Sequence, residues 1–133
     1  MYCILFFTIF ISKSLSAEEA YFEITKTDNH ETFIIKLTDP AKIDHARQII
    51  AGATQENQNI SGKIIQTRAP YNPKWSYYLE PSSIRFTEIS IEQCSSTAAD
   101  MEERVTTTGE TGVIKDIWCP YPSKPTREIV KSD

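Results

Sequence analysis

An uncharged apolar run opens the chain and decides which residues remain to fold. Met1–Ile11 has no charged side chain, and it is about half as long as the roughly 20 residues that a membrane-spanning helix needs. Small residues ending in Ser16-Ala17 follow it, a pattern typical of a secretory signal peptide. The alternative is a buried N-terminal strand of the folded domain. We therefore predict a signal peptide over residues 1–17, a single domain over residues 18–133 and a secreted protein.

The charge of the remaining chain narrows its partners. The full sequence has 14 basic and 18 acidic residues, and loss of Lys13 leaves 13 against 18, a net charge of −5. Phosphate backbones and anionic membranes bind clustered Lys and Arg, so we expect no nucleic acid partner and no membrane insertion after signal removal. With 40% hydrophobic and 24% charged residues, the composition excludes a disordered or collagen-like chain.

Secretion has two chemical consequences for this sequence. Cys3 leaves with the signal peptide, and an even pair in an oxidising compartment predicts a disulfide between Cys94 and Cys119. That bond would close a loop of about 25 residues and stabilise the fold by roughly 3–4 kcal/mol. Two buried free thiols are the alternative if the chain is not secreted. Asn59-Ile60-Ser61 is a sequon, so Asn59 is a predicted N-glycosylation site in a eukaryotic secretory pathway.

The clearest local signals predict a hairpin followed by a helix. Apolar residues alternate over Tyr21–Thr27 and Thr32–Leu37, which indicates two strands joined by turn residues. Asp39-Pro40 then begins a helix that ends at Gly52. This helix spans Pro40–Ala51, and its expected apolar stripe is Ile43, Ala46 and Ile50.

The rest of the chain predicts further strands and a weaker helix. The strands are expected at Ile60–Thr67, Trp75–Glu80, Ile84–Cys94 (with a bulge near Thr87-Glu88) and Val113–Cys119. A capping box at Thr97–Asp100 opens the second helix, and a polar loop follows over Thr106–Gly112. Three prolines, Pro120, Pro122 and Pro125, predict an irregular C-terminal tail. The fold class is α+β: a mainly antiparallel β-sheet with one well-defined and one weaker helix packed on it, and one disulfide.

An aromatic segment between Tyr71 and Tyr78 is the best candidate for recognition. Alternation assigns Trp75, Tyr77 and Leu79 to the core. Tyrosine offers a large apolar ring with a polar tip, which suits a binding surface. The candidate recognition surface consists of Tyr71, Asn72, Lys74 and Tyr78. The alternative is that the whole segment serves the core.

Residues for catalysis or metal binding do not form a recognisable set. His30 is expected in a turn and His45 on the polar side of the first helix. The sequence has no His-Glu-x-x-His, Cys-x-x-Cys, Gly-x-Ser-x-Gly or glycine-rich phosphate loop, the patterns that mark metal, nucleophile and nucleotide sites. We therefore expect no metal, no cofactor and no enzymatic activity. The acidic group of Asp100, Glu102 and Glu103 is expected on a solvated helix face, and a carboxylate hydrolase is the alternative.

The order of several short motifs resembles a known family. They are Phe33–Pro40, Ile43–Gly52, Ile60–Ile65, Tyr71–Ser76, Leu79–Ile84, Ile91–Cys94 and Trp118–Pro120. Together they resemble the N-terminal domain of the seventy-four-kilodalton calmodulin-binding protein of slime moulds, over about residues 20–130. The resemblance implies a secreted domain, similar to small bacterial proteins that are often labelled calmodulin-binding. The family tends to carry histidine where this chain has Tyr78.

These observations together favour a secreted, non-enzymatic binding protein or effector, such as a toxin or venom-type component, that acts on an unidentified protein partner. A small secreted hydrolase is one alternative, and a calmodulin-binding protein is another. Calmodulin targets are usually basic amphipathic helices. The helix over Pro40–Ala51 has Lys42 and Arg47 against Asp44, which is too little positive charge for such a target.

Overall fold

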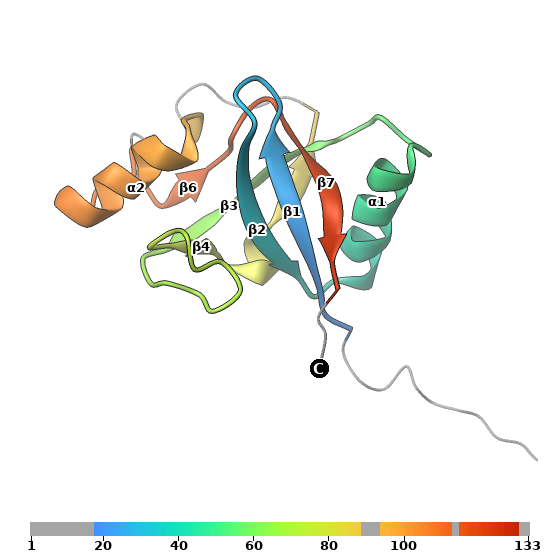
Figure 1. The fold of residues 1–133 in the computed structure, drawn as a ribbon, viewed down its shortest axis with the longest axis horizontal. Helices are drawn as coiled ribbons and strands as arrows, with labels where there is room; N and C mark the ends of the chain where they lie inside the picture. The colour runs from blue at the N-terminus through green and yellow to red at the C-terminus, as the bar shows by residue number, and fades with distance from the viewer. Residues whose placement is uncertain (1–17, 89–93, 113–114, 131–133) are drawn as a thin grey trace, which may run out of the picture.

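Two antiparallel sheets and two helices make up the described part of the protein. The computed structural model describes residues 18–88, 94–112 and 115–130, so the predicted signal peptide lies outside it. The first sheet has the strand order β2-β1-β7, and the second sheet joins β4, β5 and β6 to β3 (Figure 1). The α+β prediction is confirmed, with the strands divided between two sheets. Neither helix of the described ranges has the length and apolarity to cross a bilayer.

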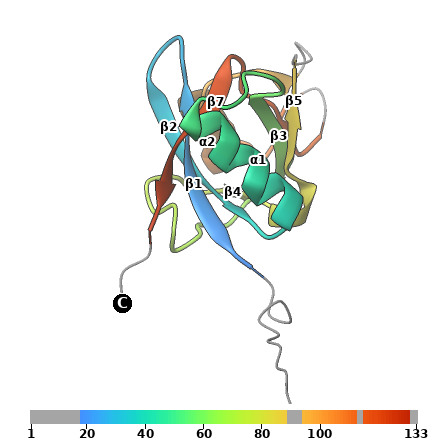
Figure 2. The same cartoon turned by 90° about the vertical axis from the view of Figure 1, so that its right-hand side faces the viewer.

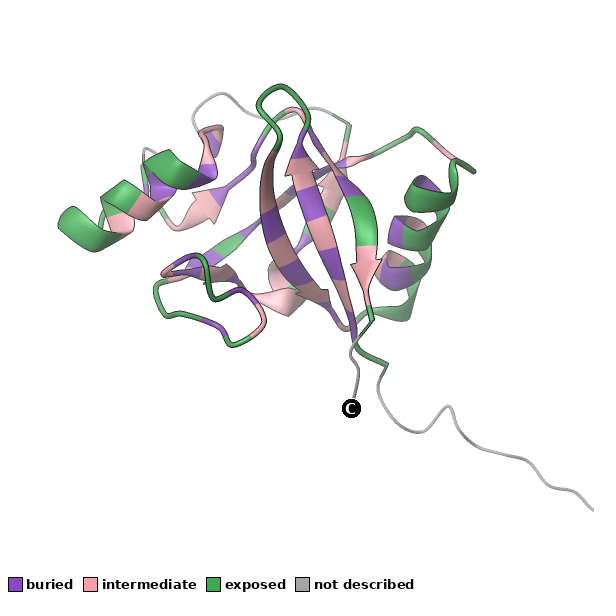
Figure 3. Ribbon diagram, viewed as in Figure 1, coloured by how far each residue is buried: buried purple, intermediate pink, exposed green. Residues whose placement is uncertain are grey.

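The first sheet is built on the predicted hairpin. β1 (Ala20–Lys26) pairs with β2 (Glu31–Leu37) in antiparallel register, with Phe22 opposite Ile35. Burial alternates along both strands, as the colours of Figure 3 show. One face of the hairpin therefore contributes to the core, and the other faces outward.

The third strand of this sheet corrects the predicted irregular tail. β7 (Ser123–Ile129) pairs with β1 along its length. Ile24 lies opposite Pro125 and Glu23 opposite Arg127, so the register shifts by one residue there. The bulge and the place of β7 at the sheet edge accommodate a proline that has no N–H to donate. The prolines shape this strand without preventing it.

The first helix has the predicted bounds and the predicted caps. α1 (Pro40–Ala51) begins where the Asp39 carboxylate accepts from the Ala41 N–H at 2.9 Å, and it ends at Gly52, which has φ +80°. Its buried residues are Ile43, Ala46 and Ile49. The predicted stripe was wrong in its last member, because Ile50 is 37% exposed. Ile49 is the residue that packs against the core instead.

An ion-pair cluster fastens α1 to the first sheet. Arg47 donates to both carboxylate oxygens of Glu128 on β7, at 3.0 and 2.9 Å, and to Glu18 at 3.3 Å. Bidentate pairs of this kind are the stronger ones among surface ion pairs. They raise the pKa of Arg47 and lower the pKa of the Glu128 carboxyl. In Figure 2 the helix lies across the side of the molecule, between the two sheets.

The second sheet is centred on β3 and has shorter strands than predicted. β3 (Asn59–Ile65) pairs with β4 (Tyr78–Leu79), β5 (Arg85–Thr87) and β6 (Ile117–Trp118). The turn Pro81–Ser83 separates β4 from β5. Of the long strand predicted to Cys94, residues 89–93 and the full span of its bulge lie outside the described residues. A Cβ at Gly62 would lie 3.2 Å from the Leu79 side chain, so glycine permits this close packing.

The second helix is capped by its own threonine and by a distant glutamate. α2 (Ala98–Thr107) has Thr97 as its N-cap, whose hydroxyl accepts from the Asp100 N–H at 2.9 Å. The Glu31 carboxylate on β2 accepts from Ala98 and Ala99 at 2.5 and 3.0 Å. Glu31 therefore satisfies amides that a helix start leaves free. The helix runs to Thr107, past the start of the predicted polar loop.

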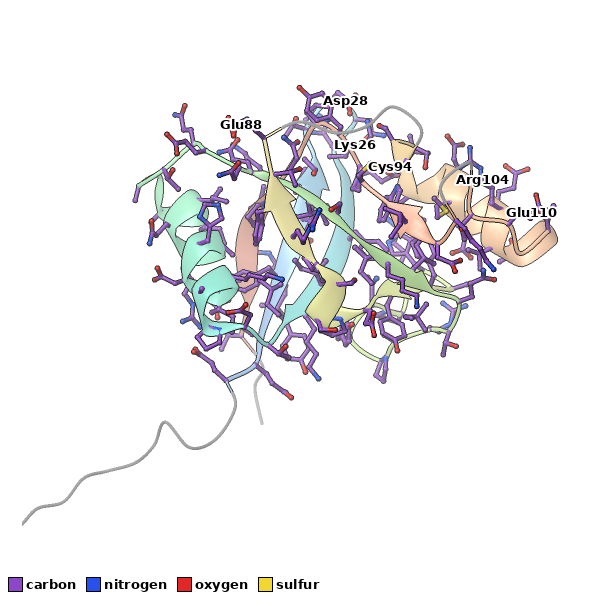
Figure 4. The ribbon with its side chains drawn as sticks, turned by 180° about the vertical axis from the view of Figure 1, so that it is seen from behind. Lys26, Asp28, Glu88, Cys94, Arg104 and Glu110 are labelled. Carbon is purple, nitrogen blue, oxygen red and sulfur yellow. A yellow bond between two sulfur atoms is a disulfide. The ribbon has the colours of Figure 1, made fainter. Side chains whose placement is uncertain are left out.

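The predicted disulfide between Cys94 and Cys119 is confirmed. The two Cα atoms are 5.3 Å apart, within the usual range for this bond. The Cys119 N–H also donates to the Cys94 carbonyl at 2.9 Å. Cys94 lies just before α2, as Figure 4 shows, so the bond anchors the entry to that helix beside β6.

Removing this bond should weaken the whole domain and free α2 first. For the double variant Cys94→Ser, Cys119→Ser we expect a loss of about 3–4 kcal/mol in the free energy of unfolding, because the unfolded chain is no longer cross-linked. Denaturant titration measures the loss, with the reduced wild type as control. Hydrogen exchange should accelerate most in α2. An unchanged unfolding midpoint would contradict the structural role of the disulfide.

Candidate functional site

A shallow apolar groove lies on the outer face of the first sheet, near the start of β1. Its volume is about 540 Å³. The residues that line it are Tyr21, Ile34, Lys36, Pro70, Tyr71 and Ile129. We call this the tyrosine groove. Tyr21 lies opposite Lys36 on β2 and opposite Ile129 on β7, so strand register brings three of these side chains together.

Alternation along the strands explains why these residues face outward. Phe33 and Ile35 are buried on the inner face of β2, and successive side chains of a strand point to opposite faces. Ile34 therefore lies on the outer face. The wall opposite comes from Pro70 and Tyr71, which belong to the segment between β3 and β4.

Aromatic packing holds that segment against the first sheet. Trp75 and Tyr77 are buried as predicted, although they lie in a loop and only Tyr78–Leu79 forms a strand. The Phe33 ring centroid is 5.2 Å from that of Tyr77 and 6.3 Å from that of Trp75. The Trp75 indole N–H donates to the Thr32 carbonyl at 3.2 Å.

The predicted recognition residues separate into three environments. Tyr71 lines the groove, and the ring of Tyr78 lies beside it with centroids 6.2 Å apart. Lys74 is exposed, with its ammonium 5.1 Å from the Trp75 ring centroid. Asn72 is not a surface residue, because only 2% of it is exposed.

Asn72 instead attaches the segment to the edge of β2. Its side-chain oxygen accepts from the Ile34 N–H at 3.2 Å, which takes the place of a strand partner at that edge. Its amide nitrogen is buried and has no partner among the described atoms. Surface assignment failed here because the residue's role depends on a strand 38 positions away.

Two charged residues that the sequence did not single out for this site brace the segment from outside. Arg68 donates to the carbonyls of Pro73 and Trp75 and to the Ser76 hydroxyl. Glu102 on α2 accepts from both the N–H and the hydroxyl of Ser76, at 2.7 and 2.6 Å. Glu102 is therefore partly buried in a specific contact and does not belong to a merely solvated face. No local pattern signals a contact between Ser76 and Glu102.

The groove is mainly apolar with one cation at its rim. Lys36 lies 3.3 Å from Glu19 and 6.0 Å from the Tyr21 ring centroid. The Tyr21 and Tyr71 rings are 5.2 Å apart. The Tyr71 hydroxyl is buried without a partner in the described part of the chain. Burial, with smaller effects of Tyr78 and Tyr21, raises the pKa of Tyr71 to about 12.

Asn59 is a structural residue in the fold and not an accessible glycosylation site. Its side-chain N–H donates to the Glu88 carbonyl at 2.9 Å, and its oxygen accepts from the Ser123 N–H at 2.7 Å. A sugar on that nitrogen would disrupt the link between β5 and the chain entering β7. The predicted modification is therefore incompatible with this side-chain position.

The histidines lie where the sequence placed them. His30 is exposed in the β1–β2 turn. His45 contacts the Asn57 carbonyl at 3.1 Å and packs edge-on against Phe86. Among the described residues, no three His, Cys, Asp or Glu side chains are grouped to hold a metal ion.

Comparison with known families tests the resemblance. The model of the N-terminal domain of the seventy-four-kilodalton binding protein matches residues 18–132, which include every residue of the groove. The chain belongs to this family. Neither the curated proteins nor the solved structures include a significant match. For this family member, the family and the fold class are therefore established together.

The buried Tyr71 hydroxyl should show itself in an alkaline titration. Because its pKa is raised from 10.0 to about 12, its contribution to stability is complete below about pH 10 and is lost as the pH rises toward 12. Phenolate absorbance of the native protein should show a late step that Tyr71→Phe diminishes. The matched control Tyr121→Phe should leave that step intact. An unchanged late step in Tyr71→Phe would show that the hydroxyl is hydrated.

Proposed function

We propose that this member of the family is a secreted, non-enzymatic binding domain that holds a protein partner in the tyrosine groove. The observation that carries the proposal is an apolar hollow with tyrosine walls on a braced surface. A volume of about 540 Å³ lies within the range of about 300–1,000 Å³ typical of ligand sites. Tyrosine is among the residues that contribute most to protein interfaces.

The groove chemistry defines the partner. Tyr21, Ile34 and Tyr71 present apolar area for one buried side chain, and Lys36 supplies a positive charge at the rim. The partner would therefore present an apolar anchor with a carboxylate close by. The arrangement suits a preformed interface, because Asn72 and the Ser76 contacts hold the groove wall in place.

The engagement of carboxylates supports binding over hydrolysis. Glu31 caps α2, and Glu102 binds Ser76. Arg47 lowers the pKa of the Glu128 carboxyl, the opposite of what a general acid requires. These contacts give each of the three acids a structural task.

Two further observations rank secretion first and calmodulin binding second. The disulfide suits an oxidising compartment, and the family match begins at residue 18, directly after the predicted signal peptide. Calmodulin takes the apolar face of a helix. In this fold α1 buries Ile43, Ala46 and Ile49 against the sheets, so that face is occupied.

The test compares a groove variant with a matched variant elsewhere. Immobilised wild type, Ile34→Glu and Ile50→Glu are used to capture proteins from cell-surface extracts, with thermal melts to verify folding. We expect a partner that binds wild type and Ile50→Glu equally but Ile34→Glu at least about tenfold more weakly, or about 1.4 kcal/mol. Ile50 is a suitable control because it is partly exposed on α1.

Two results would contradict the proposal. One is capture that is indifferent to Ile34→Glu, which would place binding elsewhere on the molecule. The other is turnover of peptide or glycan substrates by the purified domain that disappears with a single Asp or Glu substitution, which would favour the hydrolase.

A further inference from the structure

A second hollow lies at the other end of β1 and has a different chemistry. Its volume is about 390 Å³. The residues that line it are Thr27, Gln55, Gln58, Asn59, Glu88, Tyr121, Pro122, Ser123 and Lys124. We call it the polar cleft. Thr27 follows the end of β1, whereas Tyr21 of the tyrosine groove lies at its start, so the two sites are separated by the length of the strand. Figure 4 shows Glu88 at the same end of the molecule as Lys26 and Asp28.

The cleft has an exposed aromatic ring on one wall. Tyr121 is 44% exposed, one of the few large apolar side chains in the described ranges left in contact with water. The Thr27 N–H donates to the carbonyl of the next residue, Pro122, at 2.9 Å. The backbone that carries the ring is therefore tied to the first sheet, and the ring is presented on a fixed support.

The floor of the cleft is a closed set of hydrogen bonds. Asn59 links the Glu88 carbonyl and the Ser123 N–H, and the Ser123 hydroxyl donates to the Pro120 carbonyl at 2.8 Å. Ile60 donates to the same hydroxyl at 3.3 Å. Such a network costs free energy if any member is left unpaired, so the floor resists rearrangement when a ligand binds.

The rim, in contrast, carries polar groups without a described partner. The side chains of Gln55, Gln58 and Lys124 have no hydrogen bond or ion pair in the part of the chain that the structure describes, although many other polar side chains there do. Each glutamine offers a donor and an acceptor. Glu88 accepts from the Asn57 N–H through one carboxylate oxygen at 2.6 Å.

We propose that the polar cleft binds a neutral saccharide. A sugar ring has an apolar face of C–H groups, which packs on an aromatic ring, and hydroxyls that both donate and accept hydrogen bonds. Tyr121 supplies the ring, and Gln55 and Gln58 supply paired donors and acceptors. Lys124 and Glu88 carry opposite charges, so the cleft has no excess charge to select an anion or a cation.

The other hollows of the described chain fit a saccharide less well. The tyrosine groove is mainly apolar, and its one cation already lies beside Glu19. The hollow beside α1 has Lys42, His45 and Arg85 among its lining residues, which would favour an anion. Only the polar cleft combines an exposed aromatic ring with unengaged amide side chains in the described ranges.

A glycan array tests the proposal directly. The probes are immobilised neutral, sialylated and sulfated glycans, and the disulfide-bonded domain is displayed as a tetramer to raise avidity. We expect retention on neutral glycans and competition by the corresponding free oligosaccharide. Titration of the monomer with that oligosaccharide should then perturb the amide resonances of residues around Tyr121 and Gln58.

Matched variants identify the site and separate it from the tyrosine groove. Tyr121→Ala should weaken binding about tenfold, whereas Tyr121→Phe should retain it, since the ring face remains. Gln58→Ala should weaken binding as well, and the groove variant Ile34→Glu should leave it unchanged. Retention on no glycan, retention on anionic glycans only, or equal binding by Tyr121→Ala would overturn the proposal.

Discussion

Four aromatic rings centred on Phe33 join the parts of this fold. The Phe33 centroid lies 5.0 Å from that of Trp118, 5.2 Å from that of Tyr77 and 6.3 Å from that of Trp75. These rings come from β2, from β6 and from the loop before β4, so the cluster bridges both sheets. Aromatic pairs at such distances add stability beyond the area that they bury. The contact connects segments far apart in sequence, and the positions of both proposed sites depend on it.

The polar tips of the same rings fix their neighbours. Trp118 donates to the Ser96 carbonyl, and Tyr77 donates to the Ala98 carbonyl, each at 3.1 Å. Burial raises the pKa of Tyr77, and its hydrogen bond removes the cost of an unpaired hydroxyl. Since Ser96 and Ala98 flank the start of α2, the cluster and the adjacent disulfide place that helix together. Glu102 of α2 then braces the wall of the tyrosine groove.

Local signals in the sequence were sufficient for some elements but not for others. The bounds of α1 followed from Asp39 and Gly52, because helix caps depend on adjacent residues. Parity of cysteines predicted the disulfide. The strand β7 was missed because Pro125 is compatible with a strand only at an edge and beside a bulge, and neither is visible locally. Asn59 and Asn72 were assigned to the surface for the same reason, since their partners lie on other strands.

The central claim is that the Tyr71–Leu79 segment is divided between the core and the recognition surface. The free energies of unfolding of Trp75→Ala and Tyr78→Ala test it most directly. Trp75 is buried and hydrogen-bonded, so its loss should cost about 3–5 kcal/mol. Tyr78 is half-buried beside Tyr71, so Tyr78→Ala should cost only about 1 kcal/mol. Equal losses, or a larger loss in Tyr78→Ala, would contradict this division.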